Sequence, residues 1–368
     1  MNIQKYFPLL ALALAACGGG GGGDSAPPEP TPAPTGRVAL EIVAGPIGER
    51  ASLSSDPQRG CTDGAAANAV MGSSMSLAAA ADGQSLYTAE QGACDSRFRV
   101  RRLDLAAKTV TTLATGADIP AQEAPGPFQL QSFLRPTAIA QAPDGTLAIA
   151  DSDVFSGGLT TPSGRERQGL GNGVWLLSPT GQLRQLAGFE KPASTPLADG
   201  SGPQAVFQSI TVICAGAQGE FYVSDLGRVR QISANGAVTT LANAEGRNFE
   251  GLYCGQQGRN LTFSVAADGQ RKPFELQAQR LFDTPSGVAG LYSAMAGADS
   301  AWVSSPAGGT LFLMGLADGR VLPGSTLVTA GLMVAGERYT PNSSALRAAN
   351  AGVAYLPTAY SIVRLTYQ

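Results

Sequence analysis

Short apolar runs separated by turn residues dominate the middle of the chain, most clearly between residues 199 and 243. β-Branched and aromatic residues fill these runs, and Gly, Asn and Asp separate them, which is typical of strands joined by hairpin turns. The segment therefore predicts a four-stranded antiparallel unit. We place its strands at Ser209–Ala215, Glu220–Ser224, Arg228–Ser233 and Ala237–Leu241.

This unit recurs along the chain. Asp63-Gly64 stands ahead of a first strand at the same spacing as Asp199-Gly200, and the pattern returns in six repeats of unequal quality. Residues 37–368 exceed what one hydrophobic core usually holds, whereas a ring of small sheets packed on their neighbours avoids that limit. We therefore predict an all-β fold over residues 37–368, a six-bladed β-propeller.

The last repeat lacks one strand at the end of the chain. Ala351–Leu356 and Ser361–Leu365 supply its inner and third strands. An outer-strand pattern stands instead at the start of the folded region, in Val38–Ala44. We predict that Val38–Ala44 pairs beside Ser361–Thr366 and closes the ring, because closure removes the two open sheet edges of a linear array.

The succession of motifs resembles that of NHL-repeat β-propellers. It runs Asp-Gly before the first strand, Gly-x-x-Tyr-Val-x-Asp, Arg-Val-Arg-x-Ile, and Gly-x-Val-x-Thr-Leu-Ala, and it is strongest in the first three repeats. The resemblance implies a propeller that acts as a binding platform, since NHL-type propellers mostly bind very different ligands. It also implies that the acidic residue ending a second strand caps a turn and faces an arginine of the third strand, here Arg99 and Arg228.

The first 36 residues carry targeting signals rather than a fold. Residues 1–16 combine Lys5 with an apolar stretch too short to cross a bilayer, which is typical of a signal peptide. Leu14-Ala15-Ala16-Cys17 resembles the bacterial lipobox, which implies cleavage before Cys17 and its acylation, with palmitate among the expected acyl groups. An ordinary secretory signal with an incidental cysteine is the alternative. Residues 17–36 are rich in Gly and Pro and predict a tether.

Localisation and partner classes follow from these signals and from composition. Gly18 after Cys17 resembles an outer-membrane address, so we expect a lipid anchor in the outer membrane of a bacterial cell envelope, with the propeller periplasmic or surface-exposed. Charged residues make up 14% of the chain and the net charge is −3, which gives no reason to expect nucleic acid. The chain has no histidine, which removes the Ser/His triad and imidazole metal ligands. We expect a monomer.

Strand direction alternates within a blade, so the connections sort onto two faces. Loops between blades and loops between second and third strands share one face, where they are long; the remaining turns share the opposite face and are tight. We call these the long-loop face and the short-turn face. Long loops are usually functional. We therefore expect a protein or glycan partner on the long-loop face, whose segments are 46–70, 115–134, 152–172, 189–206 and 332–346.

Four of the five cysteines lie beyond Cys17, and an even number in an exported protein usually forms disulfides. Cys61 and Cys94 fall on the long-loop face, and Cys214 and Cys254 end first strands on the short-turn face. We therefore predict the pairs Cys61–Cys94 and Cys214–Cys254. Cysteines on two opposite faces cannot surround one zinc ion.

Acidic residues end three of the predicted second strands. Glu90, Asp151 and Asp225 recur there, with Asp153 beside Asp151. They could form a rim that coordinates calcium, or they could be the turn caps that the NHL resemblance implies, which we favour. We accordingly expect a non-enzymatic binding or scaffold module without a cofactor. The alternative is a calcium-dependent hydrolase or lactonase that uses these carboxylates.

Overall fold

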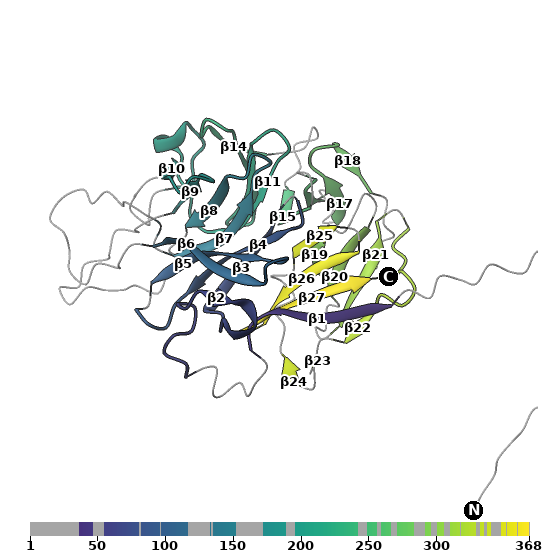
Figure 1. Cartoon of the computed structure of the whole chain (residues 1–368). Coiled ribbons are helices and arrows are strands. Elements are labelled where there is room, and N and C mark those ends of the chain that lie inside the picture. The colour runs from purple at the N-terminus through teal and green to yellow at the C-terminus, as the bar shows by residue number, and fades with distance from the viewer. Residues whose placement is uncertain are drawn as a thin grey trace, which may run out of the picture. The chain divides into compact units, whose positions relative to one another are not determined.

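The computed structural model arranges the described residues as short antiparallel strands joined by turns (Figure 1). Residues 1–35 and 36–368 form separate units, and the described residues all belong to the second. Among them, no helix is long and apolar enough to cross a membrane. The structure describes residues 37–46, 55–80, 82–95, 97–116, 133, 135–151, 172–188, 196–241, 249–255, 259–265, 271–282, 291–295, 300–304, 310–316, 318–328, 332–334, 337–339, 347–350, 352–358 and 360–367.

The repeat between residues 199 and 243 forms one four-stranded sheet, which we number blade 3. Its strands follow the order β11-β12-β13-β14 and are antiparallel throughout. Each strand begins and ends within one residue of its predicted bounds. The turn before the last strand needs Gly236, because its φ is +89° and an added Cβ would lie 2.5 Å from the Leu186 carbonyl oxygen.

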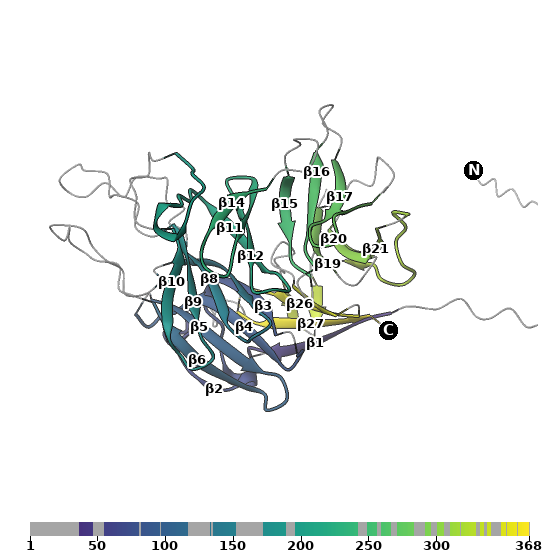
Figure 2. The ribbon, with the colours of Figure 1, turned by 90° about the horizontal axis from the view of Figure 1, so that it is seen from above.

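Six sheets of this kind follow one another, and they confirm the predicted six-bladed β-propeller (Figures 1 and 2). The strands are β3 Ser73–Ala79, β4 Ser85–Gln91, β5 Phe98–Asp104 and β6 Thr109–Thr115, with β2 Gly64–Ala65 at the edge, in blade 1; β7 Pro136–Gln141, β8 Leu147–Asp151, β9 Gly173–Leu177 and β10 Leu183–Ala187 in blade 2; β11 Ile210–Ala215, β12 Phe221–Asp225, β13 Arg228–Ile232 and β14 Val238–Thr240 in blade 3; β15 Phe249–Tyr253, β16 Leu261–Val265, β17 Arg271–Glu275 and β18 Arg280–Leu281 in blade 4; β19 Leu291–Met295, β20 Ser300–Ser304, β21 Thr310–Gly315 and β22 Leu327–Val328 in blade 5; and β25 Arg347–Asn350, β26 Val353–Pro357, β27 Ile362–Tyr367 and β1 Val38–Ala44 in blade 6.

Further short elements lie in the connections. Two 3-10 helices, η1 Ala66–Asn68 and η2 Gly202–Gln204, lie in the loops that lead into blades 1 and 3. A hairpin of β23 Leu332–Val334 and β24 Glu337–Tyr339 lies between blades 5 and 6.

The ring closes as predicted. β1 pairs antiparallel with β27, from Val38 opposite Tyr367 to Ala44 opposite Ile362, and the two strands lie side by side in Figure 1. The first strands of the blades also contact one another in the circular order β3, β7, β11, β15, β19, β25 and back to β3. One detail of the prediction is wrong: Val353–Pro357 is the second strand of blade 6, and the inner strand is β25. The sequence of β25, Arg-Ala-Ala-Asn, has neither β-branched nor aromatic residues to reveal it.

The core is divided among the spaces between neighbouring blades. Each of six clusters of buried apolar residues joins two consecutive blades, including blades 6 and 1, where Tyr355 and Ile362 meet Met71 and Leu77. A second strand such as β12 is buried on both faces, whereas in the outer strand β6 exposed residues alternate with mostly half-buried ones. Burial between stacked sheets is therefore what holds the ring together.

Strand β1 should be essential to stability, and this can be tested by truncation. Removing residues 1–45 deletes β1, and we expect the melting temperature to fall by roughly 10 °C, because losing a paired strand and the buried Ala44 costs several kcal/mol at about 2–4 °C each. Removing residues 1–36 is the control and should leave the melting curve unchanged. Equal melting temperatures for the two truncations, measured by circular dichroism, would contradict ring closure by β1.

Candidate functional site

A buried arginine lies at the centre of blade 3. Arg230 is fully buried, and its guanidinium donates hydrogen bonds to two carboxylates and two carbonyls. Nη1 bonds Asp225 Oδ2 at 2.8 Å and the Val206 carbonyl at 2.8 Å. Nη2 bonds the Ala198 carbonyl at 2.6 Å and Asp199 Oδ1 at 3.0 Å. One side chain therefore ties the end of the second strand to the loop that leads into the blade.

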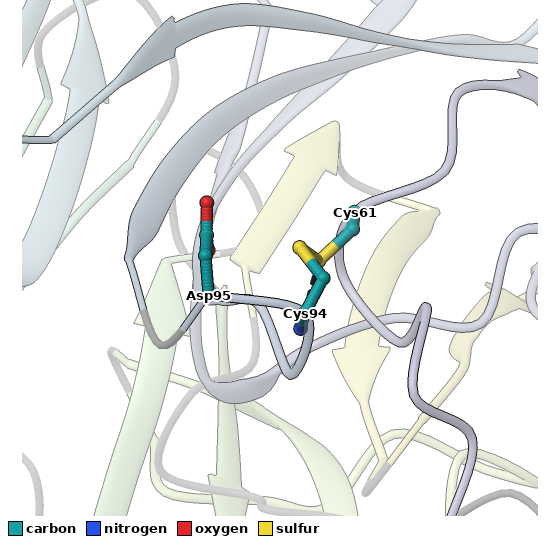
Figure 3. A group of neighbouring side chains, drawn as sticks. All are labelled: Cys61, Cys94 and Asp95. Carbon is teal, nitrogen blue, oxygen red and sulfur yellow. Dashed lines mark hydrogen bonds between the residues drawn. A yellow bond between two sulfur atoms is a disulfide. The ribbon is translucent and has the colours of Figure 1, made fainter.

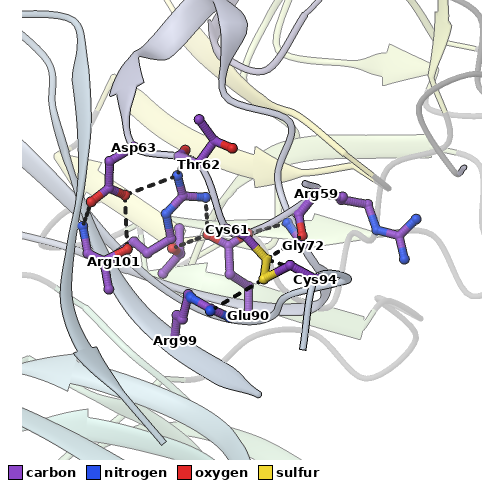
Figure 4. A network of polar contacts seen from close by, with 11 residues as sticks. Arg59, Cys61, Thr62, Asp63, Gly72, Glu90, Cys94, Arg99 and Arg101 are labelled. Atoms are coloured by element: carbon purple, nitrogen blue, oxygen red, sulfur yellow. Dashed lines mark hydrogen bonds and ion pairs between the residues drawn. A yellow bond between two sulfur atoms is a disulfide. The ribbon is translucent and has the colours of Figure 1, made fainter. Parts of the chain in front are cut away.

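Blade 1 repeats this arrangement around Arg101, which is also fully buried (Figure 4). Nη1 donates to Glu90 Oε1 at 3.1 Å, and Nη2 donates to the Thr62 carbonyl and lies 3.4 Å from Asp63 Oδ1. Asp63 in turn accepts bonds from Thr112 N at 2.7 Å and from Thr112 Oγ1 at 2.9 Å. The network thus reaches from the second strand to the fourth.

The aspartate of the Asp-Gly motif plays the same part in blade 3. Asp199 accepts bonds from Thr240 N and Thr240 Oγ1, both at 2.8 Å. Burial works against ionisation of Asp199, but the bonds from Thr240 and Arg230 outweigh it and lower its pKa. We call each set of four residues an arginine clamp: the carboxylate ending the second strand, the arginine, the Asp-Gly aspartate and the threonine. The clamp explains why these motif residues recur together.

The arginine of each clamp is not the one that the NHL resemblance implies. Arg99 and Arg228 stand directly opposite Glu90 and Asp225 in the strand pairing, yet the bonds come from the arginines two positions later. Arg228 is exposed, and Arg99 instead pairs with Asp95 at 2.8 Å. Residues i and i+2 share one face of a strand, so both candidates point the same way. The deeper arginine is the one that reaches the carboxylate.

The carboxylates that end the second strands form bonds within their own blades. Asp225 Oδ1 accepts bonds from the backbone N–H groups of Gln208 and Ser209, at 3.0 and 2.8 Å. Glu90 and Asp151 each accept a backbone N–H bond from the residue just before their own first strand. These are the turn caps that the resemblance implies. At least one oxygen atom of each carboxylate is thereby bonded to a protein donor.

The described part of the chain does not gather these three carboxylates within ligand distance of one another. Asp153 lies outside the described residues. The group of potential metal ligands that is found comprises Cys61, Cys94 and Asp95 (Figure 3). Its sulfur atoms form a disulfide, and the hydrogen bond from Arg99 lowers the pKa of the Asp95 carboxyl. An ion is therefore not needed to explain this group.

Both predicted disulfides are confirmed. Cys61–Cys94 joins the loop before blade 1 to the loop between its second and third strands, and Cys214–Cys254 joins the first strand of blade 3 to the residue that follows the first strand of blade 4. Their surroundings differ. Cys94 is exposed and its Sγ lies 3.5 Å from Arg99 Nη2, whereas Cys214 is fully buried in an apolar cluster.

Two adjoining grooves lie on the short-turn face, on either side of the turns of blade 3. The groove between blades 2 and 3 measures about 500 Å³, and the groove between blades 3 and 4 measures about 600 Å³. Ala217, Gln218 and Ala234 line both. The sequence analysis did not predict these grooves, because it considered only long loops as binding sites. The glutamines near these turns could have indicated a polar binding surface here. Docking on the long-loop face stays a prediction, because most of its long segments lie outside the described residues.

Replacing Arg230 with Met should lower the free energy of unfolding far more than the same substitution at Arg228. Arg230→Met leaves Asp225 buried without its counter-charge, and we expect the free energy of unfolding to fall by about 3–5 kcal/mol. Arg228→Met, at an exposed side chain, should stay within about 0.5 kcal/mol of the wild type. Urea denaturation measures both. Equal losses would show that the clamp arginine is wrongly assigned.

The two disulfides should differ in the ease of reduction. A mild dithiol should open Cys61–Cys94 before Cys214–Cys254, because Cys94 is accessible and the neighbouring Arg99 cation favours the thiolate form. Timed reduction followed by alkylation and mass mapping gives the order. Arg99→Gln should slow the first reduction and leave the second unchanged. Reduction in the reverse order would overturn this expectation.

No protein-family profile and no curated protein sequence matches this chain, so the NHL resemblance stays a prediction. Among solved structures, it is similar to a structural genomics protein of unknown function from Bacteroides thetaiotaomicron VPI-5482, at 13% identity and a TM-score of 0.46, over 90% of this chain and 76% of that one. It is also similar to a gluconolactonase from Xanthomonas campestris, at 13% identity and 0.43, over 80% and 85%, and to the PQQ-bound form of an aldose sugar dehydrogenase from Streptomyces coelicolor, at 12% and 0.43, over 91% and 100%. Similarity this weak carries no statement about activity.

Proposed function

We propose that this protein is an envelope-anchored β-propeller that binds other molecules without transforming them. The observation that carries this proposal is that the buried charged residues of the protein bond to one another and to the backbone. Arg101 and Arg230, with their carboxylate partners, fasten loops to strands, and none of the clamp residues lines either groove among the described residues. A general acid or base must come within hydrogen-bond reach of its substrate. Groups committed to an internal clamp are poorly placed for that role.

The rigidity of the body also suits binding. Six apolar clusters join the blades, and two disulfides fix the ends of loops and strands. A surface that is already ordered loses little conformational entropy when a ligand binds, which raises affinity. A scaffold of this kind therefore favours recognition over a reaction that needs a moving lid.

We propose that the anchor is a lipid on Cys17. The lipobox-like residues ahead of it and the Gly- and Pro-rich residues 17–36 support a tether to the outer membrane, with the propeller in the periplasm or at the cell surface. A protein or glycan partner on the long-loop face belongs to the same proposal. The length and the Gly- and Pro-rich composition of residues 17–36 would let this tether hold the propeller away from the membrane.

A calcium-dependent hydrolase or lactonase is the competing function. The recurrence of Glu90, Asp151 and Asp225 at the ends of second strands, with Asp153 nearby, motivates it. The bonds that the first three already accept within their own blades weigh against it. Calcium usually takes six to eight oxygen ligands, whereas both carboxylate oxygens of Glu90 and of Asp225 already accept bonds from protein donors.

The anchor can be tested by replacing Cys17 with Ser. Wild-type protein expressed in a Gram-negative host should incorporate radioactive palmitate and sediment with outer-membrane fragments. Cys17→Ser should lose the label and leave the membrane fraction, because serine lacks the thiol that is acylated. Cys61→Ser, which keeps Cys17, should stay labelled and is the matched control. Label retained in Cys17→Ser would contradict the proposed anchor.

The binding role is tested separately by calcium and lactones. We expect calcium to leave the melting temperature unchanged and lactone substrates to remain intact. A rise of several degrees together with lactone turnover that Asp225→Asn abolishes would replace the proposed function with the hydrolase.

A further inference from the structure

The groove between blades 3 and 4 contains a cluster of hydrogen-bonding groups around Tyr222. Tyr222 Oη donates to Glu220 Oε1 at 3.3 Å and accepts a bond from Gln231 Nε2 at 3.3 Å. Burial and the Glu220 carboxylate raise the pKa of the Tyr222 hydroxyl to about 12, so the phenol stays protonated at physiological pH. All three side chains line the groove.

The polar groups of this cluster are held in place before any ligand binds. A Cβ on Gly216 would clash with the carboxylate of Glu220, so glycine is what lets the Glu220 side chain fold over the end of the first strand. Glu220 Oε2 also accepts a bond from Gln218 N at 2.9 Å. Gln277 Oε1 accepts a bond from Asn260 N at 2.6 Å. The groove therefore presents a fixed pattern of donors and acceptors.

The chemistry of the lining narrows the class of ligand. The groove between blades 3 and 4 is lined by one carboxylate, Glu220, and by no lysine or arginine among the described residues. The groove between blades 2 and 3 adds Asp144 and Arg184, whose charges balance, so the two linings together are slightly negative and disfavour an anionic ligand. Amide side chains donate and accept at once, as do the neighbouring hydroxyls of a sugar. Half-buried Leu241 adds an apolar surface against which the C–H face of a sugar ring can pack, and buried Phe249 and Leu276 lie behind it. The amides are those of Gln218, Gln231, Gln277 and Gln279.

We propose that the two adjoining grooves form one binding site for a linear, neutral oligosaccharide that crosses the turns of blade 3. Each groove has the size of a small-molecule site, and the residues common to both, Ala217, Gln218 and Ala234, mark the crossing point. This proposal rests on the proposed function in one respect, since both assume that the protein binds its ligand without transforming it. It adds a ligand class and uses the short-turn face rather than the long-loop face.

The experiment uses the full chain in detergent. An array of neutral linear oligosaccharides of glucose, galactose and N-acetylglucosamine, beside uronic and sialylated ones, identifies the preferred class, and titration calorimetry with the best neutral tetrasaccharide gives its affinity. Ala234→Trp fills the crossing point and should weaken binding at least about tenfold. Tyr222→Phe removes the hydroxyl that holds Glu220 and Gln231 in place and should weaken binding by roughly 3- to 10-fold, the value of about one hydrogen bond. Ala107→Trp, in an exposed turn of blade 1 outside both grooves, should bind like the wild type.

Several results would overturn this inference. They are an array without neutral ligands, a preference for acidic sugars or peptides, or equal affinities of Ala234→Trp and Ala107→Trp. A melting curve of each variant shows whether it is folded. If Ala234→Trp proves to be unfolded, its loss of binding is disregarded and the affinity of Tyr222→Phe decides the test. None of these outcomes touches the proposed function, whose non-enzymatic binding role would instead be contradicted by turnover of the sugar or of a lactone.

Discussion

The structure depends on two guanidinium groups that are removed from water. A buried charge is tolerated only when it is paired and hydrogen-bonded, and Arg101 and Arg230, both fully buried, each meet two carboxylates and at least one backbone carbonyl. This requirement selects residues far apart in the sequence. It demands an acid at the end of the second strand, an aspartate ahead of the first strand and a threonine in the fourth. The recurring motif is therefore the set of partners that one buried cation needs.

Blade 2 shows what replaces the cation when it is missing. Trp175 pairs with the residue two before Asp151, just as Arg230 pairs with the residue two before Asp225. The indole is almost fully buried and belongs to the same apolar cluster as Val100 of blade 1. An apolar ring fills the position that a guanidinium fills in blades 1 and 3. Hydrophobic burial and hydrogen bonding are thus alternative ways to fill the same place in a blade.

Much of the fold could be predicted from the sequence, because strand pattern and turn residues are local signals. Blade 3 was placed within one residue, and the alternation of strand direction was enough to pair Cys61 with Cys94 and Cys214 with Cys254. The sequence could not show which arginine of the third strand belongs to the clamp, since the two candidates lie on one face of the strand and differ only in how deeply they are buried. The grooves could not be found either, because they arise where turns of separate blades meet. Which turns lie next to one another depends on how the blades are arranged in the ring, and the sequence of a single repeat does not show it.

The division of the connections into two faces has a consequence for recognition. On the long-loop face, the clamps and the Cys61–Cys94 disulfide fix the bases of the loops that lead into blades 1 and 3. On the short-turn face, tight turns with Gly219 and Gly236 at positive φ hold the groove walls without any long segment. Among the described residues, no long segment lines these grooves and could close over them. Affinity there must come from groups already in place, and the bonds that hold Glu220 and Tyr222 supply that preorganisation.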